Sequence, residues 1–196
     1  MSLRATAEDV VRRTLAAPAT LGTGRLLAID GPAGSGKTTL AAAVVDAVPP
    51  GHPVDPFQKS APAGVHVVEV HHLRGHPRRL VGPLARDEPG GYRRYDWLTE
   101  QEAEWHEVAP AALLVLEGVG AGCSGYAEHI STLVWVEAPH DVRLARGVER
   151  DVELYGLHGD RGRLEARWRA WMADEQALHD RDRTRQRADV VVEGVG

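Results

Sequence analysis

The sequence predicts an α/β fold in which a mostly parallel sheet lies between two layers of helices. Short, continuously apolar segments alternate along the chain with segments of helical periodicity, a pattern typical of strands joined by crossover helices. A glycine-rich turn directly follows the first apolar segment and leads into a helix. These observations predict a three-layer α/β/α architecture, and a length of 196 residues fits one domain.

The glycine-rich turn has the spacing of a phosphate-binding loop. Residues 28–40 read AIDGPAGSGKTTL and contain G-x-x-x-x-G-K-[ST]. Glycines let backbone N–H groups face phosphate oxygens, and the following helix directs the positive end of its dipole to the same anion. We expect Lys37 to reach the β- and γ-phosphates and the Thr38 hydroxyl to hold Mg²⁺. The predicted nucleotide-binding residues are Gly31, Pro32, Ala33, Gly34, Ser35, Gly36, Lys37, Thr38 and Thr39. The sequence therefore predicts a P-loop NTPase.

The remaining elements follow from composition and period. Strands are expected at residues 25–30, 65–70, 111–117, 132–137 and 188–193, and helices at 6–17, after the P-loop, at 139–154 and after 162. The interpretation divides the chain into an N-terminal helix and linker (1–24), a substrate-side segment (73–110) and a lid region (139–163). Within the substrate-side segment, residues 73–91 are expected to form a mobile loop with one helical turn, and 99–108 a short polar segment. Val142, Ala145, Val148 and Val152 are expected on the inner side of the lid helix, and Trp168 and Trp171 in the core.

Composition narrows the classes of partner. The net charge of −5 argues against a nucleic-acid or anionic-membrane surface, and no apolar run approaches the ~20 residues of a membrane span. The single Cys123 excludes an internal disulfide, and the first residues do not resemble a secretory leader. We therefore expect a cytoplasmic protein with a small-molecule partner, and the sequence leaves open whether it forms a homo-oligomer.

Two further sets of residues fit phosphoryl transfer. Glu117 closes the most apolar predicted strand, where an open α/β sheet places its ligands, so it is the candidate for a second Mg²⁺-binding group. Arg143, Arg146 and Arg150 are spaced to share one helical face, and guanidinium groups there could close over a migrating phosphoryl group. Because only two of the 23 basic residues are Lys, a solvated arginine face is the alternative interpretation of this set.

In this order, the motifs resemble the uridine kinase-like family of P-loop kinases. The matching stretches, from Arg25 to Gly194, are AIDGPAGSGKTT, the triplet Tyr95-Asp-Trp97, LLVLEGV, WVEAPHDVRLARGVERD and ADVVVEG. The resemblance implies transfer of the γ-phosphate of ATP or GTP to a hydroxyl of a nucleoside or similar small molecule. It also implies that Glu117 assists Mg²⁺, Arg146 is a lid arginine, Tyr95 lines the acceptor pocket and Arg143 reaches the acceptor or its phosphates.

The chain departs from the family where the acceptor proton is handled. The family's second strand usually ends in an Asp that accepts this proton, whereas here His71 and His72 follow the strand. A neutral His71 suits a general base, and Glu69 on the same strand face is an alternative. The third alternative is a nucleotide-binding switch or scaffold with weak or lost kinase activity. The family's His after the Tyr-Asp-aromatic triplet is also absent, because Leu98, Thr99 and Glu100 follow Trp97.

Overall fold

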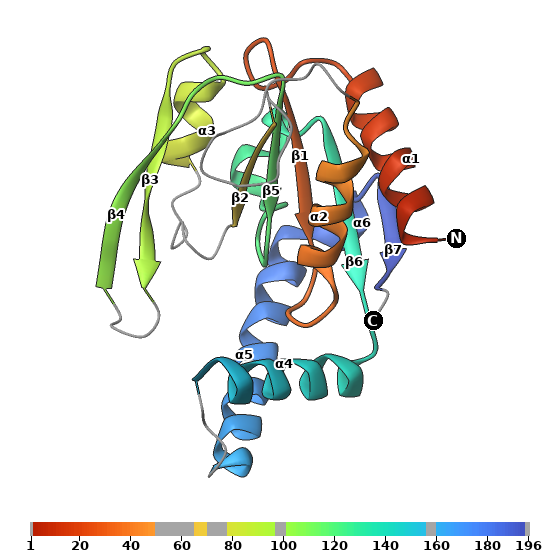
Figure 1. Cartoon of the computed structure of the whole chain (residues 1–196), viewed down its shortest axis with the longest axis vertical. Helices are drawn as coiled ribbons and strands as arrows, with labels where there is room; N and C mark the ends of the chain where they lie inside the picture. The colour runs from red at the N-terminus through yellow and green to blue at the C-terminus, as the bar shows by residue number, and fades with distance from the viewer. Residues whose placement is uncertain (1, 50–64, 70–77, 97–100, 156–159, 195–196) are drawn as a thin grey trace.

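The computed structural model describes residues 2–49, 65–69, 78–96, 101–155 and 160–194. Its centre is a five-stranded sheet in the order β2-β5-β1-β6-β7, with every neighbouring pair parallel (Figure 1). The strands are β1 (Arg25–Asp30), β2 (Val65–Glu69), β5 (Leu113–Glu117), β6 (Thr132–Glu137) and β7 (Val190–Glu193). The predicted parallel sheet and its five strands are thus confirmed, with ends shifted by up to two residues.

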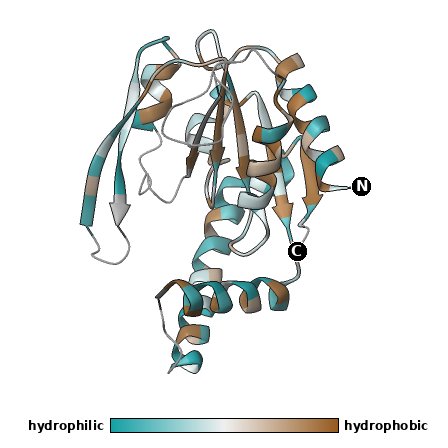
Figure 2. Cartoon of the chain, viewed as in Figure 1, coloured by the Kyte–Doolittle hydropathy of each residue, from teal (hydrophilic) through white to brown (hydrophobic). Residues whose placement is uncertain are grey.

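Helices α1 (Leu3–Ala16) and α2 (Lys37–Ala47) cover one face of the sheet (Figure 1). Alternate β1 residues, Leu27 and Ile29, pack there in a core that includes Val10 and Val44 from the two helices. The central strands β1 and β5 are hydrophobic except at their ends (Figure 2), because both of their faces are buried. The expected helix at 6–17 begins earlier, since the Ser2 hydroxyl accepts the Ala5 amide at its N-terminus.

The opposite face of the sheet carries α3 (Arg78–Leu84) and the 3₁₀ segment η2 (Ser124–His129). Leu26 and Ala28 of β1 point into this second core, which Leu80 and Tyr126 complete. The interpretation of 73–91 as a mobile loop with one helical turn is therefore wrong for residues 78–84, which form α3 and bury three apolar side chains; residues 73–77 lie outside the described residues.

A two-stranded antiparallel hairpin follows α3. Its strands are β3 (Gly90–Asp96) and β4 (Gln101–Val108), and Figure 1 shows the hairpin standing away from the main sheet. The expected polar segment at 99–108 is thus a strand. Residues of β4 on both of its faces are exposed, so the strand lacks the alternation of apolar and polar residues that marks a half-buried strand in a sequence.

Helices α4 (His140–Tyr155) and α5 (Arg161–Asp182) lie beyond the ends of the strands where the arrowheads point (Figure 1), and the short α6 (Thr184–Arg187) leads into β7. Val148 and Trp168 are buried between α4 and α5, as expected. Ala145 and Trp171 are exposed, so their predicted burial is wrong; Leu144 and Met172 pack in this cluster. None of the helices described here is both long and apolar enough to cross a membrane.

Candidate active site

The P-loop connects the end of β1 to the start of α2, as the motif predicts. Gly31 and Gly34 adopt φ values of 143° and 76°, in a region of backbone space that favours glycine. A Cβ on Gly34 would lie 2.7 Å from the carbonyl oxygen of Arg143, and one on Gly31 would lie 2.1 Å from that of Val136. The loop is therefore packed tightly against α4 and β6, and these two positions need glycine for close approach as well as for conformation.

Lys37 is the first residue of α2 and lies under the loop. Its side chain is buried, and its Nζ donates to the carbonyl oxygen of Pro32 at 2.9 Å. Burial lowers the pKa of this ammonium group, while the nearby carboxylates of Glu117, Asp30 and Glu175 oppose that shift. The ammonium group is thus held beside the loop by an internal acceptor, where an anion would be a stronger partner.

Thr38 and Glu117 meet at the carboxyl end of β5. Thr38 Oγ1 donates to Glu117 Oε1 at 3.2 Å, and Glu117 is buried. Hydroxyl and carboxylate oxygens are the ligands that Mg²⁺ prefers. In the same loop, the Ser35 hydroxyl is buried without a hydrogen-bond partner in the described part of the chain, which marks a polar interior. The residues present therefore fit a Mg²⁺–phosphate group, held by Thr38 and Glu117.

The three arginines of α4 have different environments. Arg146 Nη1 makes a long contact of 3.5 Å with the carbonyl oxygen of Gly34 in the P-loop. Arg143 is buried and pairs with Glu175 of α5 at 2.8 Å, and Arg150 lies over the ring of Trp168. Among the three arginines, Arg146 is thus the one whose side chain contacts the P-loop itself.

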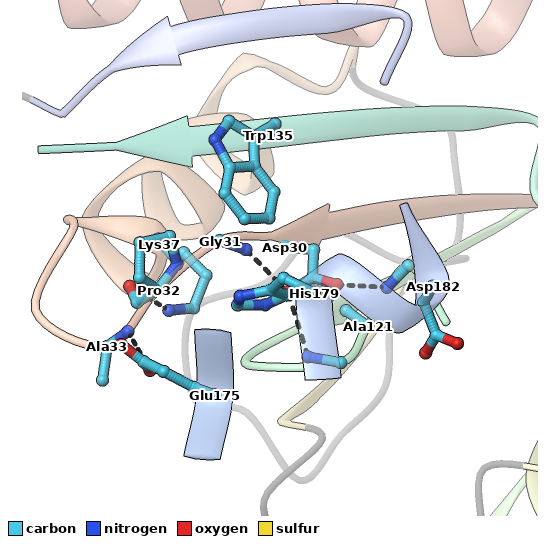
Figure 3. Close-up of polar contacts among 12 residues, drawn as sticks. Asp30, Gly31, Pro32, Ala33, Lys37, Ala121, Trp135, Glu175, His179 and Asp182 are labelled. Atoms are coloured by element: carbon cyan, nitrogen blue, oxygen red, sulfur yellow. Dashed lines mark hydrogen bonds and ion pairs between the residues drawn. The ribbon is translucent and has the colours of Figure 1, made fainter. Parts of the chain in front are cut away.

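Three polar residues that the sequence analysis does not single out contact the P-loop or each other beside it. Asp30, fully buried, accepts the backbone amides of Gly31, Gly120 and Gly122 at 2.6–2.9 Å. His179 Nε2 lies 3.2 Å from the same carboxylate, and Glu175 accepts the Ala33 amide (Figure 3). One signal in the sequence could have pointed to Glu175 and His179. The helical spacing of Leu164, Trp168 and Met172 continues onto Glu175, His179 and Asp182, and all six residues are buried.

The acceptor side is only partly described. The backbone of Tyr95 lies in β3, but its side chain is not among the parts that the structure describes. His71 lies outside the described residues. The backbone of Glu69, at the end of β2, pairs in register with that of Glu117. The last residue of β2 therefore lies at the same end of the sheet as Glu117, and the assignment of a base to Glu69 or His71 stays a prediction.

Comparisons with solved structures match this architecture over nearly the whole chain. A candidate fructose transport system kinase from Silicibacter sp. TM1040 is 24% identical over 97% of this chain and 98% of its own, with a TM-score of 0.67. A possible uridine kinase from Bacillus stearothermophilus is 20% identical over 96% and 98%, with a TM-score of 0.59. A candidate P-loop kinase from Saccharomyces cerevisiae, circularly permuted, is 9% identical over 98% of both chains, with a TM-score of 0.57. No family model and no curated protein matches the sequence.

The fold and the loop define a P-loop protein of the three-layer α/β/α class. Within that class the chain has the fold of the uridine kinase-like P-loop kinases, so the resemblance is confirmed at the level of the fold.

Proposed function

We propose that this chain is an ATP-dependent kinase that transfers the γ-phosphate to a hydroxyl group of a small molecule, with a nucleoside as the first acceptor class to test. The observation that carries the proposal is the convergence of Lys37, Thr38 and Glu117 at the P-loop, on a kinase fold. GTP is the alternative donor, because the loop contacts phosphates and not the base.

The reaction assigns a task to each residue. The acceptor oxygen attacks the γ-phosphorus, an O–P bond forms, and the bond from phosphorus to the β–γ bridging oxygen breaks to release ADP. Lys37 and the loop amides stabilise the charge on the phosphates, and Arg146 approaches from α4 to stabilise the transferring group. Mg²⁺, held by Thr38 and Glu117, would neutralise charge on the β- and γ-phosphates.

The acceptor proton needs a base at the end of β2. The proposal assigns it to His71 or Glu69, and the register of Glu69 opposite Glu117 supports a base at this edge. Tyr95 on the hairpin is assigned to the acceptor pocket. For Arg143, the pairing with Glu175 supports a role beneath the loop more directly than contact with an acceptor.

A nucleotide-binding switch without metabolite phosphorylation is the second candidate. The observation that favours it is the sequence His71-His72 where the family carries an acid.

ADP release measured across a panel of nucleosides, vitamins and sugars separates the two candidates. The kinase requires turnover that depends on one acceptor class and that falls in Glu69→Gln or in His71→Ala. Glu8→Gln, in a surface ion pair with Arg4 on α1, is the matched control and should leave the rate unchanged. Nucleotide binding without acceptor-dependent turnover, together with a gain of activity in His71→Asp, would support the switch and contradict the kinase.

A further inference from the structure

A buried acidic side chain, Glu175, contacts the P-loop directly. Its Oε2 accepts the backbone amide of Ala33 at 2.7 Å, and its Oε1 accepts from Arg143 Nη1 at 2.8 Å (Figure 3 shows the Ala33 contact). The side chain is only 1% exposed. A carboxylate beside a loop that binds anions opposes binding by its charge alone, so its presence needs a different reason.

Arg143 removes most of that electrostatic conflict. Its guanidinium pairs with Glu175 and also donates through Nε to the carbonyl oxygen of Ala138 at 3.2 Å. A buried carboxylate without a partner is strongly destabilising, whereas a hydrogen-bonded pair is close to neutral. The pair therefore lets a strong acceptor lie under the loop, while Lys37 and the loop amides supply the positive field.

The same face of α5 makes a second contact one turn later. His179, four residues after Glu175, approaches Asp30, the residue immediately before Gly31. Asp30 in turn accepts the amides of Gly31, Gly120 and Gly122. One rigid helix thus fixes two points of the loop, its entry at Asp30 and its third residue at Ala33.

From these contacts we infer that Glu175 is a positioning residue of the P-loop. The Ala33 amide is committed to a protein acceptor, so the contact shapes the loop and does not itself bind a phosphate. By holding Ala33, Glu175 presets the turn through Gly34 to Gly36 that presents the following amides to a nucleotide. The inference rests on the proposed nucleotide-binding function.

The variant Glu175→Gln distinguishes a positioning role from a purely electrostatic one, because the two roles predict opposite changes in nucleotide affinity. Glutamine has the same shape but is a weaker acceptor for Ala33, and its amide group meets the donor Arg143. If only charge mattered, loss of a negative group beside the phosphates would tighten nucleotide binding. Positioning predicts the reverse: a Kd for Mg·ADP raised about tenfold or more, the scale of one lost charge-assisted hydrogen bond.

The experiment combines calorimetric titration of Mg·ADP with hydrogen exchange of the Ala33 amide in the nucleotide-free protein. Glu165→Gln, on the same helix but in a surface pair with Arg169, is the matched control and should change the Kd by less than about twofold. In Glu175→Gln the Ala33 amide should exchange faster, whereas in Glu165→Gln it should remain protected.

A further variant covers the case in which Glu175→Gln does not fold. Replacing both partners, Arg143→Met with Glu175→Met, exchanges a buried ion pair for apolar groups of similar size and should retain a cooperative thermal transition. Faster exchange at Ala33 in this folded variant supports the inference. Unchanged protection of Ala33, or equal or tighter Mg·ADP binding by Glu175→Gln, would overturn it. Absence of Mg·ADP binding by the wild type would instead overturn the proposed function, and the Ala33 exchange would still decide the role of Glu175.

Discussion

Thr38 Oγ1 and Glu117 Oε1 lie 3.2 Å apart and join the first turn of α2 to the carboxyl end of β5. The two residues are 79 positions apart in the sequence, and parallel pairing of β1 with β5 brings them together. A hydroxyl and a carboxylate in contact at the mouth of a P-loop form a compact pair of hard oxygen ligands. The pair is the structural basis for assigning a Mg²⁺-dependent reaction to this site.

Glu117→Gln should remove most of the effect of magnesium on nucleotide affinity. A neutral amide is a poorer ligand for a hard cation than a carboxylate, so Mg²⁺ should enhance ADP binding about tenfold less in the variant. Calorimetric titration of ADP with Mg²⁺ and with EDTA measures this enhancement. The matched control is Glu137→Gln at the end of β6, on the other side of β1 from β5, where the carboxylate pairs with Arg185. An undiminished enhancement in Glu117→Gln would reject the assignment.

Lys37→Met should raise the thermal stability of the nucleotide-free protein. Burial lowers the pKa of Lys37, which means that the folded state disfavours the charged form. This penalty is complete below the lowered folded pKa and disappears as the pH rises from that value towards the unfolded value of about 10.4. The Tm of the variant should therefore exceed that of the wild type near neutral pH, and the difference should shrink at alkaline pH. A difference that grows with pH would show the opposite sign of the shift.

Gly34→Ala should destabilise the fold and weaken nucleotide binding together. Alanine at φ = 76° is strained by about 1–2 kcal/mol, and its Cβ would meet the Arg143 carbonyl oxygen. Gly162→Ala in the first turn of α5 is the control, because a Cβ there meets nothing within 4 Å and alanine favours a helix by about 0.5–1 kcal/mol. Chemical denaturation should give opposite signs for the two variants. Equal effects would contradict the tight packing of the loop on α4.

Trp168→Ala should cost about 3–5 kcal/mol of folding free energy, whereas Trp171→Ala should cost little. Trp168 is buried against Gly147, and its indole N–H donates to Asp151 at 2.8 Å; Trp171 is 45% exposed. Urea denaturation measures both variants, three residues apart on one helix. Similar losses from the two would contradict the orientation of α5.

The sequence predicts the P-loop, the parallel sheet and the meeting of Thr38 with Glu117, because each depends on a local motif or on continuous apolar strands. It does not predict which face of α5 is buried. Trp171 fits the helical spacing after Leu164 as well as Met172 does, so spacing alone does not decide which of the two is buried. The buried face of α5 continues through Glu175 and His179. The cost of burying these polar side chains is offset by their contacts with Arg143 and Asp30, which come from distant segments.

Arg143 shows the same limit within the site. Its spacing with Arg146 on α4 predicts a shared role at the phosphates, and the family resemblance adds the acceptor. The structure pairs Arg143 with Glu175, 32 residues later, in a contact that no local pattern encodes, and the role of Arg143 toward an acceptor stays a prediction. The sequence predicts only one helical turn near α3 and no strand at β4 for a related reason: tertiary packing stabilises α3 and hairpin pairing stabilises β4, and neither leaves a clear local period.

A thermal-shift titration with Mg·ATP, carried out on the wild type and on Lys37→Met, tests most directly whether the P-loop binds a nucleotide. The wild type should gain stability with increasing Mg·ATP, as a ligand that binds only the folded state requires, and the variant should gain much less. Because the variant is expected to be at least as stable without nucleotide, a lost shift cannot be attributed to unfolding. An equal shift in both proteins would contradict phosphate binding at the P-loop.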